Sequence, residues 1–233
     1  MIELKNLSKT YKVGTESVQA LNNISLTIED GEFLVIVGPS GSGKSTLLHL
    51  IGGLDKPTSG EISVDGENIK TLRDKKLSAF HNQKIGYIFQ DFKLHPHINI
   101  LDNVKIPLVF NKDKKYKRST MERKARQLLK EVGLSNRTKH KPHEISGGQK
   151  QRVSIARALV NSPTILLADE PMGDMDSITG EKIIQLLKEF HKKKKVTMIV
   201  VTHDMSIAKF ATRTVEIKDG KLITKNRFNK FMT

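Results

Sequence analysis

The 233-residue chain has no cysteine and no tryptophan, and aromatic residues make up only 5% of it. The missing thiols exclude disulfide bonds and thiolate metal sites, and they allow a reducing compartment. Long hydrophobic runs are also missing. The longest runs, such as FLVIV and ILLA, are far shorter than the roughly 18–20 residues that a membrane-spanning helix needs. The start, MIELKNLSKT, has no apolar stretch after a basic one. We therefore expect an aliphatic core, no secretory signal and a chain that is soluble by itself.

Acidic residues are scarce, with 25 Asp and Glu against 40 Lys and Arg, so the formal charge is +15. Such a charge is compatible with nucleic acid, with an anionic membrane surface or with a solvated lysine-rich surface. The lysines are spread along the chain, with clusters at Lys112–Arg118 and Lys192–Lys195, and no aromatics are interleaved at a spacing for base stacking. We favour the solvated surface and expect no nucleic-acid partner; charge does not decide function here.

Three unbroken apolar runs, FLVIV, TILLAD and VTMIVVTH, are typical of strands buried on both faces of a parallel sheet. Further strands are predicted at IELKNLSKTY, ISLTI and EISVDG, and short ones at TVEIKDG and KLITK. Charged segments of helical period dominate residues 91–160; in Met121–Gly133 an apolar stripe is followed by Gly133 as a C-cap. The stripe consists of Ala125, Leu128, Leu129 and Val132. We predict one α/β domain, with a core at about 1–90 and 161–233 and a helical subdomain at about 91–160.

A glycine-rich loop, GPSGSGKST, follows the strand FLVIV, opens a helix and fits the pattern G-x-x-x-x-G-K-[ST] in full. Its backbone N–H groups can surround phosphates, Lys44 supplies a full charge to the β- and γ-phosphates, and Ser45 offers a hydroxyl to Mg²⁺. ATP is favoured over GTP, because NKDK at Asn111–Lys114 has its aspartate one position early for the guanine motif N-K-x-D. The predicted nucleotide-binding residues are Gly38, Pro39, Ser40, Gly41, Ser42, Gly43, Lys44, Ser45 and Thr46.

Polar side chains follow three other apolar strands, where ligand sites of open α/β sheets lie. Asp169 suits the role of holding Mg²⁺, and Glu170 is placed to orient the attacking water. Pro171 is expected to keep Glu170 extended. His203 is predicted to contact the γ-phosphate, and the amide of Gln90 to reach Mg²⁺ or the water. The weaker alternatives are a solvated acidic turn and ordinary polar residues leaving their strands.

A second glycine-rich stretch, SGGQ, opens the helix after His143. Ser146 and Gln149 satisfy the S-x-x-Q capping box, which leaves Gly147 and Gly148 unexplained. Bare N–H groups at a helix start let a phosphate approach. Since one chain holds one nucleotide, we predict a symmetric homodimer in which each chain presents SGGQ to the ATP bound by the other.

The order and spacing of these motifs resemble those of ATP-binding-cassette (ABC) ATPases over essentially the whole chain. GPSGSGKS looks like the family's Walker A, Gln90 its Q-loop, SGGQ its signature, ILLADE its Walker B and His203 its switch histidine. The resemblance implies the P-loop NTPase fold of ABC type: a mostly parallel core sheet, an N-terminal antiparallel β-subdomain and an α-helical insertion. It also implies that Tyr11 is the aromatic residue that stacks on adenine.

The family resemblance further implies an ATP-hydrolysing subunit that powers a separate transmembrane permease, gripped around Asp91–Val104, at the cytoplasmic face of the cell membrane. SKTYKVGTESVQALNNISL and YIFQDFKL are similar to the subgroup of macrolide-export, lipoprotein-releasing and antimicrobial-peptide-resistance ATPases, which suggests export or extraction of a peptide, lipoprotein or drug-like substrate. The alternatives are a membrane complex that signals without transport and a soluble nucleic-acid-associated ABC ATPase. The segment MGDMDS departs from the family's D-loop at Asp174, whereas Asp176 and Ser177 match.

Overall fold

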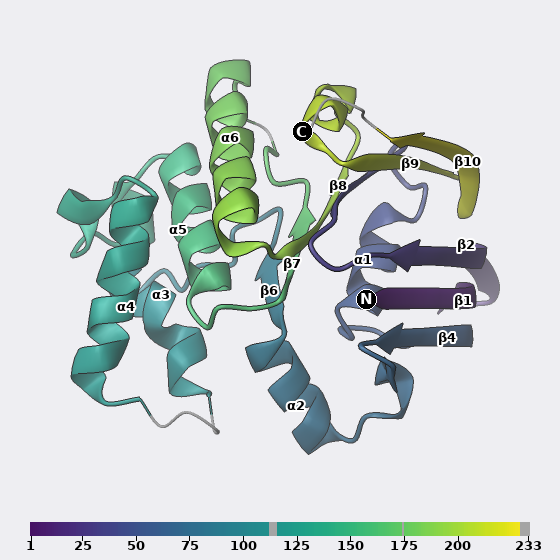
Figure 1. Ribbon diagram of the computed structural model, residues 1–233, viewed down its shortest axis with the longest axis horizontal. Helices are drawn as coiled ribbons and strands as arrows, with labels where there is room; N and C mark the ends of the chain where they lie inside the picture. Colours follow the sequence, from purple (N-terminus) through teal and green to yellow (C-terminus); the bar gives the residue numbers. More distant parts are fainter. Residues whose placement is uncertain (112–115, 174, 229–233) are drawn as a thin grey trace. The chain divides into compact units, whose positions relative to one another are not determined.

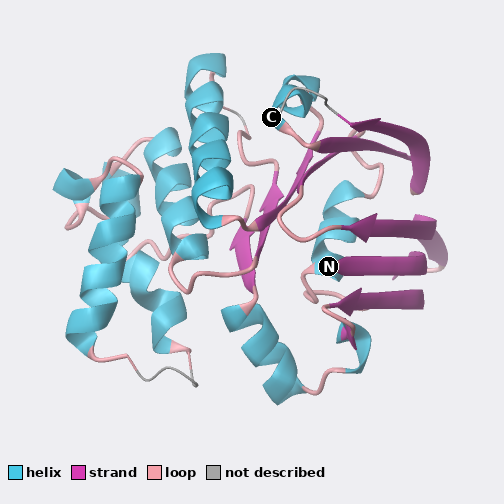
Figure 2. Ribbon diagram, in the orientation of Figure 1, coloured by secondary structure: helices cyan, strands magenta, loops and turns pink. Residues whose placement is uncertain are grey.

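The structure, a computed structural model, describes residues 1–111, 116–173 and 175–228. Its contacts divide the chain into a first unit, Met1–Leu77 with Val196–Thr233, and a second unit, Ser78–Lys195. Figures 1 and 2 show the ribbon of each unit. Helix α2 (Asp74–Gln83) crosses the boundary between them. The segment NKDK begins at the last residue before the first gap, and Asp174 is the second gap, so both interpretations fall outside the described residues.

The first unit contains two sheets. One is antiparallel in the order β2-β1-β4-β5, in which the long β1 and β2 form a hairpin. In the other, β3 pairs parallel with both β8 and β9, and β10 pairs antiparallel with β9. The elements are β1 (Ile2–Val13), β2 (Glu16–Ile28), β3 (Phe33–Val37), α1 (Lys44–Ile51), β4 (Ser59–Val64), β5 (Glu67–Asn68), the short 3-10 helices η1 (Ile69–Thr71) and η4 (Met205–Phe210), β8 (Thr197–Thr202), β9 (Arg213–Lys218) and β10 (Lys221–Phe228).

In the second unit, helices pack beside two parallel strands, and α5 contacts α3, α4, α6 and β6 (Figure 1). The predicted stripe on α4 is confirmed: Ala125, Leu128, Leu129 and Val132 are all buried, each contributing on the order of 1 kcal/mol or more. Gly133 follows in the left-handed region with φ of 74°. The elements are β6 (Ile85–Ile88), α3 (Ile100–Val109), α4 (Arg118–Glu131), η2 (Ser135–Arg137), η3 (Pro142–Glu144), α5 (Gly147–Leu159), β7 (Ile165–Asp169) and α6 (Ser177–Lys194).

The predicted fold class is confirmed. The three apolar runs form β3, β7 and β8, every residue of which is buried, as expected for strands covered on both faces. The segment 91–160, expected to be a helical subdomain, lies within the second unit, which also includes β6, β7 and α6. Among the described residues, no helix combines the length and the apolar character that crossing a membrane requires.

Candidate functional site

The phosphate loop lies between β3 and α1, and its backbone explains the glycine spacing. Gly43 caps the first turn of α1 with φ of 100°, and a side chain there would place its Cβ 2.4 Å from the carbonyl oxygen of Ala20. Gly41 has φ of 78° with no described atom near its Cβ position, so it is needed for the turn rather than for packing. The first turn of α1 has no acidic residue, so the helix start keeps its positive character.

Two buried polar groups of this loop fit a phosphate. The Lys44 side chain folds over the loop, and its Nζ donates to the carbonyl oxygens of Gly38 and Pro39, each at 2.9 Å. The Ser42 hydroxyl is buried, and the described residues provide no hydrogen-bond partner for it. Phosphate oxygens would accept from both groups and from the N–H groups at the start of α1. The residues present therefore fit the triphosphate that the sequence predicts.

His203 lies at the same sheet edge as the phosphate loop. Strands β3 and β8 run parallel, and Val37 is in register with Thr202. The residues that follow them, Gly38 and His203, therefore leave the sheet side by side. The placement agrees with the predicted γ-phosphate role of His203, which stays a prediction.

Tyr11 lies near the C-terminal end of β1 and is partly buried. Its phenol donates a hydrogen bond to Asp55 Oδ2 at 2.7 Å, and burial followed by this bond raises the pKa of Tyr11. The phenol thus stays protonated and anchored. Asp55 lies 44 positions from Tyr11 in the sequence and matches no motif, so it could not be predicted as its partner.

In the second unit, three predicted residues share one sheet edge. Strands β6 and β7 are parallel, with Ile88 in register with Ala168. Asp169 is the last residue of β7 and Glu170 follows it, while Gln90 lies two residues after the end of β6. The structure thus brings the amide and both carboxylates to the carboxyl ends of the two strands. The carboxylate of Asp169 is buried. Burial is the main cause that raises the pKa of Tyr87, and the negative charge of Asp169 raises it further.

The expectation that Glu170 is extended is wrong. Glu170 has φ of 42°, in the left-handed region that residues other than glycine rarely adopt. Pro171 disfavours the right-handed helical region at Glu170, but it does not force the extended one. The chain instead turns at once, and the N–H of Gly173 donates to the Glu170 carbonyl at 2.9 Å. Such a conformation costs about 1–3 kcal/mol and persists only where the surroundings hold it, as they do at many functional sites.

The SGGQ stretch forms the start of α5, with the capping box in place. The N–H of Gln149 donates to Ser146 Oγ at 3.3 Å, and the N–H of Ser146 donates to Gln149 Oε1 at 3.0 Å. The two glycines differ in their surroundings. No described atom lies within 4 Å of a Cβ built on Gly147, whereas a Cβ on Gly148 would lie 2.6 Å from Thr179 Cγ2. Gly147 therefore leaves the helix start open, and Gly148 is required by packing against α6.

Helix α5 also holds the two loops that follow β6 and β7. Gln151 is buried, and its Nε2 donates to the carbonyl of Pro171. The Arg157 guanidinium donates to the carbonyl of Phe92 at 2.7 Å and to that of Lys93. Burial lowers the pKa of Arg157 to about 10, so it remains charged at neutral pH.

The loop after Gln90 needs this support. Phe92 and Lys93 are both left-handed, with φ of 57° and 47°. The side chain of Asn103, fully buried on α3, exchanges hydrogen bonds with the backbone of His95, at 2.8 and 3.1 Å. Sequence reasoning missed Asn103, Gln151 and Arg157; the only available signal was a polar residue on the apolar side of a helix.

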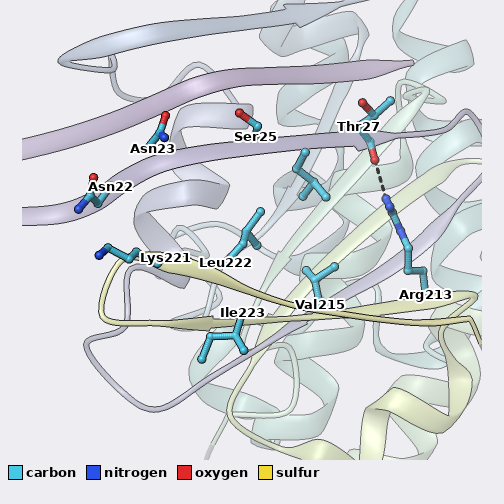
Figure 3. A pocket seen from close by; sticks show the side chains of 10 residues that line it. Asn22, Asn23, Ser25, Thr27, Arg213, Val215, Lys221, Leu222 and Ile223 are labelled. Carbon is cyan, nitrogen blue, oxygen red and sulfur yellow. Dashed lines mark hydrogen bonds between the residues drawn. The ribbon is translucent and has the colours of Figure 1, made fainter.

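A cavity of about 790 Å³ lies between β2 and the β9–β10 hairpin (Figure 3). Its guanidinium, on Arg213, is paired with Glu32 and donates to the carbonyl of Thr27 at 2.6 Å. None of the residues lining it comes from the phosphate loop.

Within the described ranges, no three His, Asp or Glu side chains come together to hold a metal ion. Mg²⁺ is usually held by one or two protein ligands together with phosphates and water. Ser45, Gln90 and Asp169 offer the hydroxyl, amide and carboxylate oxygens that suit this ion.

Comparison with known proteins agrees with the motifs. Residues 21–173 match the ABC transporter family. The ATP-binding cassette MJ0796 of Methanocaldococcus jannaschii is 47% identical over 232 residues, covering 99% of each chain. Its dimeric structure in a post-hydrolysis state, bound to ADP and Pi, matches with a TM-score of 0.92 at 46% identity, covering 99% of this chain and 100% of that one.

Two other relatives confirm the predicted subgroup. The lipoprotein-releasing system ATP-binding protein LolD of Geobacter metallireducens is 45% identical over 223 residues, 96% of this chain and 98% of LolD. The macrolide export ATP-binding/permease protein MacB of Rhodopirellula baltica is 44% identical over 220 residues, 94% of this chain and 32% of MacB. The chain therefore belongs to the ABC transporter family, of which it is an ATP-binding and ATP-hydrolysing subunit.

Proposed function

We propose that this subunit binds ATP with Mg²⁺, pairs with a second copy around the nucleotides, and powers a separate permease that exports or extracts a peptide, lipoprotein or drug-like molecule. The observation that carries the proposal is the phosphate loop. Its buried Lys44 and its buried Ser42 hydroxyl, together with a helix start whose first turn has no acidic residue, fit a triphosphate.

The site residues have separate roles in this proposal. Lys44 and the loop N–H groups bind the β- and γ-phosphates, and Tyr11 stacks on adenine. Mg²⁺, held by Ser45, Gln90 and Asp169, supplies positive charge to the phosphates when it is bound. Glu170 orients the attacking water and polarises it, and His203 contacts the γ-phosphate.

The homodimer is supported by the open helix start at Gly147. Each copy would present Ser146, Gly147, Gly148 and Gln149 to the nucleotide of the other, so each site is completed in trans. The relative MJ0796 is described as dimeric and bound to ADP and Pi. In this arrangement ATP joins the two copies, and its hydrolysis releases them.

The family resemblance implies a permease contact around Asp91–Val104 on the second unit. Arg157, which lines a neighbouring groove, binds the carbonyls of Phe92 and Lys93 in that segment, so a permease segment would dock here. A groove of about 460 Å³ is lined by residues of α2, β6, α3 and α5, among them His81, Tyr87, Phe110 and Arg157. Phe110 is 67% exposed beside it. Exposed aromatic residues are favoured in protein interfaces. MacB carries ATP-binding and permease functions in one protein, as its name says. By docking in this way, the subunit would act at the cytoplasmic face of the membrane.

The test is a pull-down of the tagged Glu170→Gln variant with ATP and Mg²⁺ from solubilised membranes of the source organism. We expect a multi-span membrane protein to co-purify, and to be lost when Lys44→Ala or Phe110→Asp is added. Recovery of nucleic acid or ribosomes without a membrane protein would overturn the transport proposal and leave the ATPase chemistry intact. ATP-dependent substrate flux through the reconstituted complex would separate transport from signalling.

A further inference from the structure

Three side chains of the first unit form a hydrogen-bonded chain that ends at Tyr11. Lys9 and Tyr11 lie two residues apart on β1, and Asp55 lies in the loop between α1 and β4. Lys9 Nζ donates to Asp55 Oδ1 at 2.7 Å, and the Tyr11 phenol donates to Asp55 Oδ2, also at 2.7 Å. Both carboxylate oxygens are therefore used: Oδ1 accepts from Lys9 and from the Lys56 N–H, and Oδ2 accepts from Tyr11.

The chain is partly withdrawn from water. The side chains of Lys9 and Asp55 are 12% and 30% exposed. Burial works against the Asp55 charge, but the hydrogen bonds from Lys9, Tyr11 and the Lys56 N–H outweigh it and hold the pKa of Asp55 below its usual range. Asp55 is thus a charged acceptor at neutral pH, and a hydrogen bond to a charged acceptor is stronger than a neutral one.

Asp55 is also fixed relative to the phosphate-binding helix. Helix α1 ends at Ile51, Gly53 turns left-handed with φ of 67°, and the N–H of Leu54 donates back to the carbonyl of His49 at 2.9 Å. This closure places Asp55 directly after the end of the helix that Lys44 begins.

We propose that Asp55, held by Lys9, is a positioning residue that fixes the Tyr11 ring as the stacking surface for the nucleobase and ties that ring to the helix of the phosphate loop. The ammonium of Lys9 also lies 4.7 Å from the ring centroid, so one face is occupied by a cation and the base would use the other. The inference rests on the proposed ATP site and deepens it. Its consequence is a fixed spacing between the base and the triphosphate.

The experiment compares KM for ATP with the inhibition constant of tripolyphosphate, which has the phosphates and no base. Asp55→Asn and Tyr11→Phe are each expected to raise KM about fivefold, the loss typical of one hydrogen bond, and to leave the inhibition constant of tripolyphosphate unchanged. Because the two residues act through one bond, the double variant should also show about a fivefold effect. Glu61→Gln, an exposed carboxylate change on β4, is the matched control.

Three outcomes would overturn the inference. The first is an additive, roughly 25-fold effect in the double variant, the second is equal weakening of tripolyphosphate, and the third is no effect of either change. If Asp55→Asn fails to fold, Tyr11→Phe still tests the inference, because it leaves the Lys9–Asp55 pair intact. Lys44→Ala separates the proposals: it should abolish binding of both ligands, and normal binding there would refute the ATP site itself.

Discussion

Alanine substitutions at the two adjacent signature glycines should change stability in opposite directions. At Gly147 the added methyl meets no described atom within 4 Å, so Gly147→Ala should stabilise the chain by up to about 1 kcal/mol through helix propensity. At Gly148 the same methyl would lie 2.6 Å from Thr179 Cγ2. Overpacking of this kind costs about 1–3 kcal/mol, which exceeds the propensity gain, so Gly148→Ala should destabilise the chain.

The two substitutions should also differ in function. Free energies of unfolding would be measured with urea without nucleotide, and dimerisation by size exclusion with ATP in the Glu170→Gln background. Gly147→Ala should lose the dimer despite its greater stability, because the methyl lies where the partner's nucleotide would approach. Thr179→Ser removes the clashing methyl. It keeps the backbone N–H of residue 179, which donates to the side chain of the N-cap Asp176 at the start of α6. It should therefore restore the stability of Gly148→Ala and leave that of Gly147→Ala unchanged.

Two results would refute this reasoning. If Gly147→Ala were as destabilised as Gly148→Ala, the open space at the helix start would not exist in solution. If Gly147→Ala formed the ATP-dependent dimer and hydrolysed ATP normally, the helix start would not be the surface that meets the second nucleotide.

Four further predictions concern single residues. Glu170→Gln should bind ATP, stop turnover and accumulate as a dimer, since the water loses its polarising carboxylate; hydrolysis at the wild-type rate would refute this role. Lys44→Ala should abolish nucleotide binding in a direct titration, and unchanged affinity would argue against the phosphate loop. Arg157→Met removes the donor of two loop carbonyls and should lower the free energy of unfolding in urea by about 1–3 kcal/mol. The control Arg126→Met breaks an exposed ion pair and should lower it by under about 1 kcal/mol. Because the pKa of Asp55 is lowered in the folded state, its stabilising contribution is present above the unfolded-state pKa and is lost as the pH falls through the folded-state pKa. The difference in unfolding free energy between wild type and Asp55→Asn should therefore shrink over that pH range. A constant difference would contradict the charge-based account.

Features that depend on neighbouring residues could be predicted from the sequence. The parallel strands follow from apolar runs, the stripe on α4 from helical period, the capping box on α5 from a spacing of three, and the phosphate loop from an eight-residue pattern. Each is decided by contacts along a short segment, so its physical cause is visible in the order of the residues. The carboxyl-end positions of Gln90, Asp169, Glu170 and His203 follow in the same way, because parallel strands end at a common edge.

Only the tertiary structure decided the contacts between distant segments. Thr179 lies 31 positions from Gly148 and leaves no room for a side chain there. Asp55 anchors Tyr11 across 44 positions, and Arg157 holds the loop after Gln90 across 64 positions. Glu170 is the instructive case. Its neighbour Pro171 disfavours the right-handed helical region, and the choice among the other backbone regions depends on the turn that Gln151 of α5 holds. The sequence by itself thus determined the elements, the phosphate loop and the edge where the chemistry lies. The tertiary structure decided how the side chains are held there, because no local pattern records a partner brought near by folding.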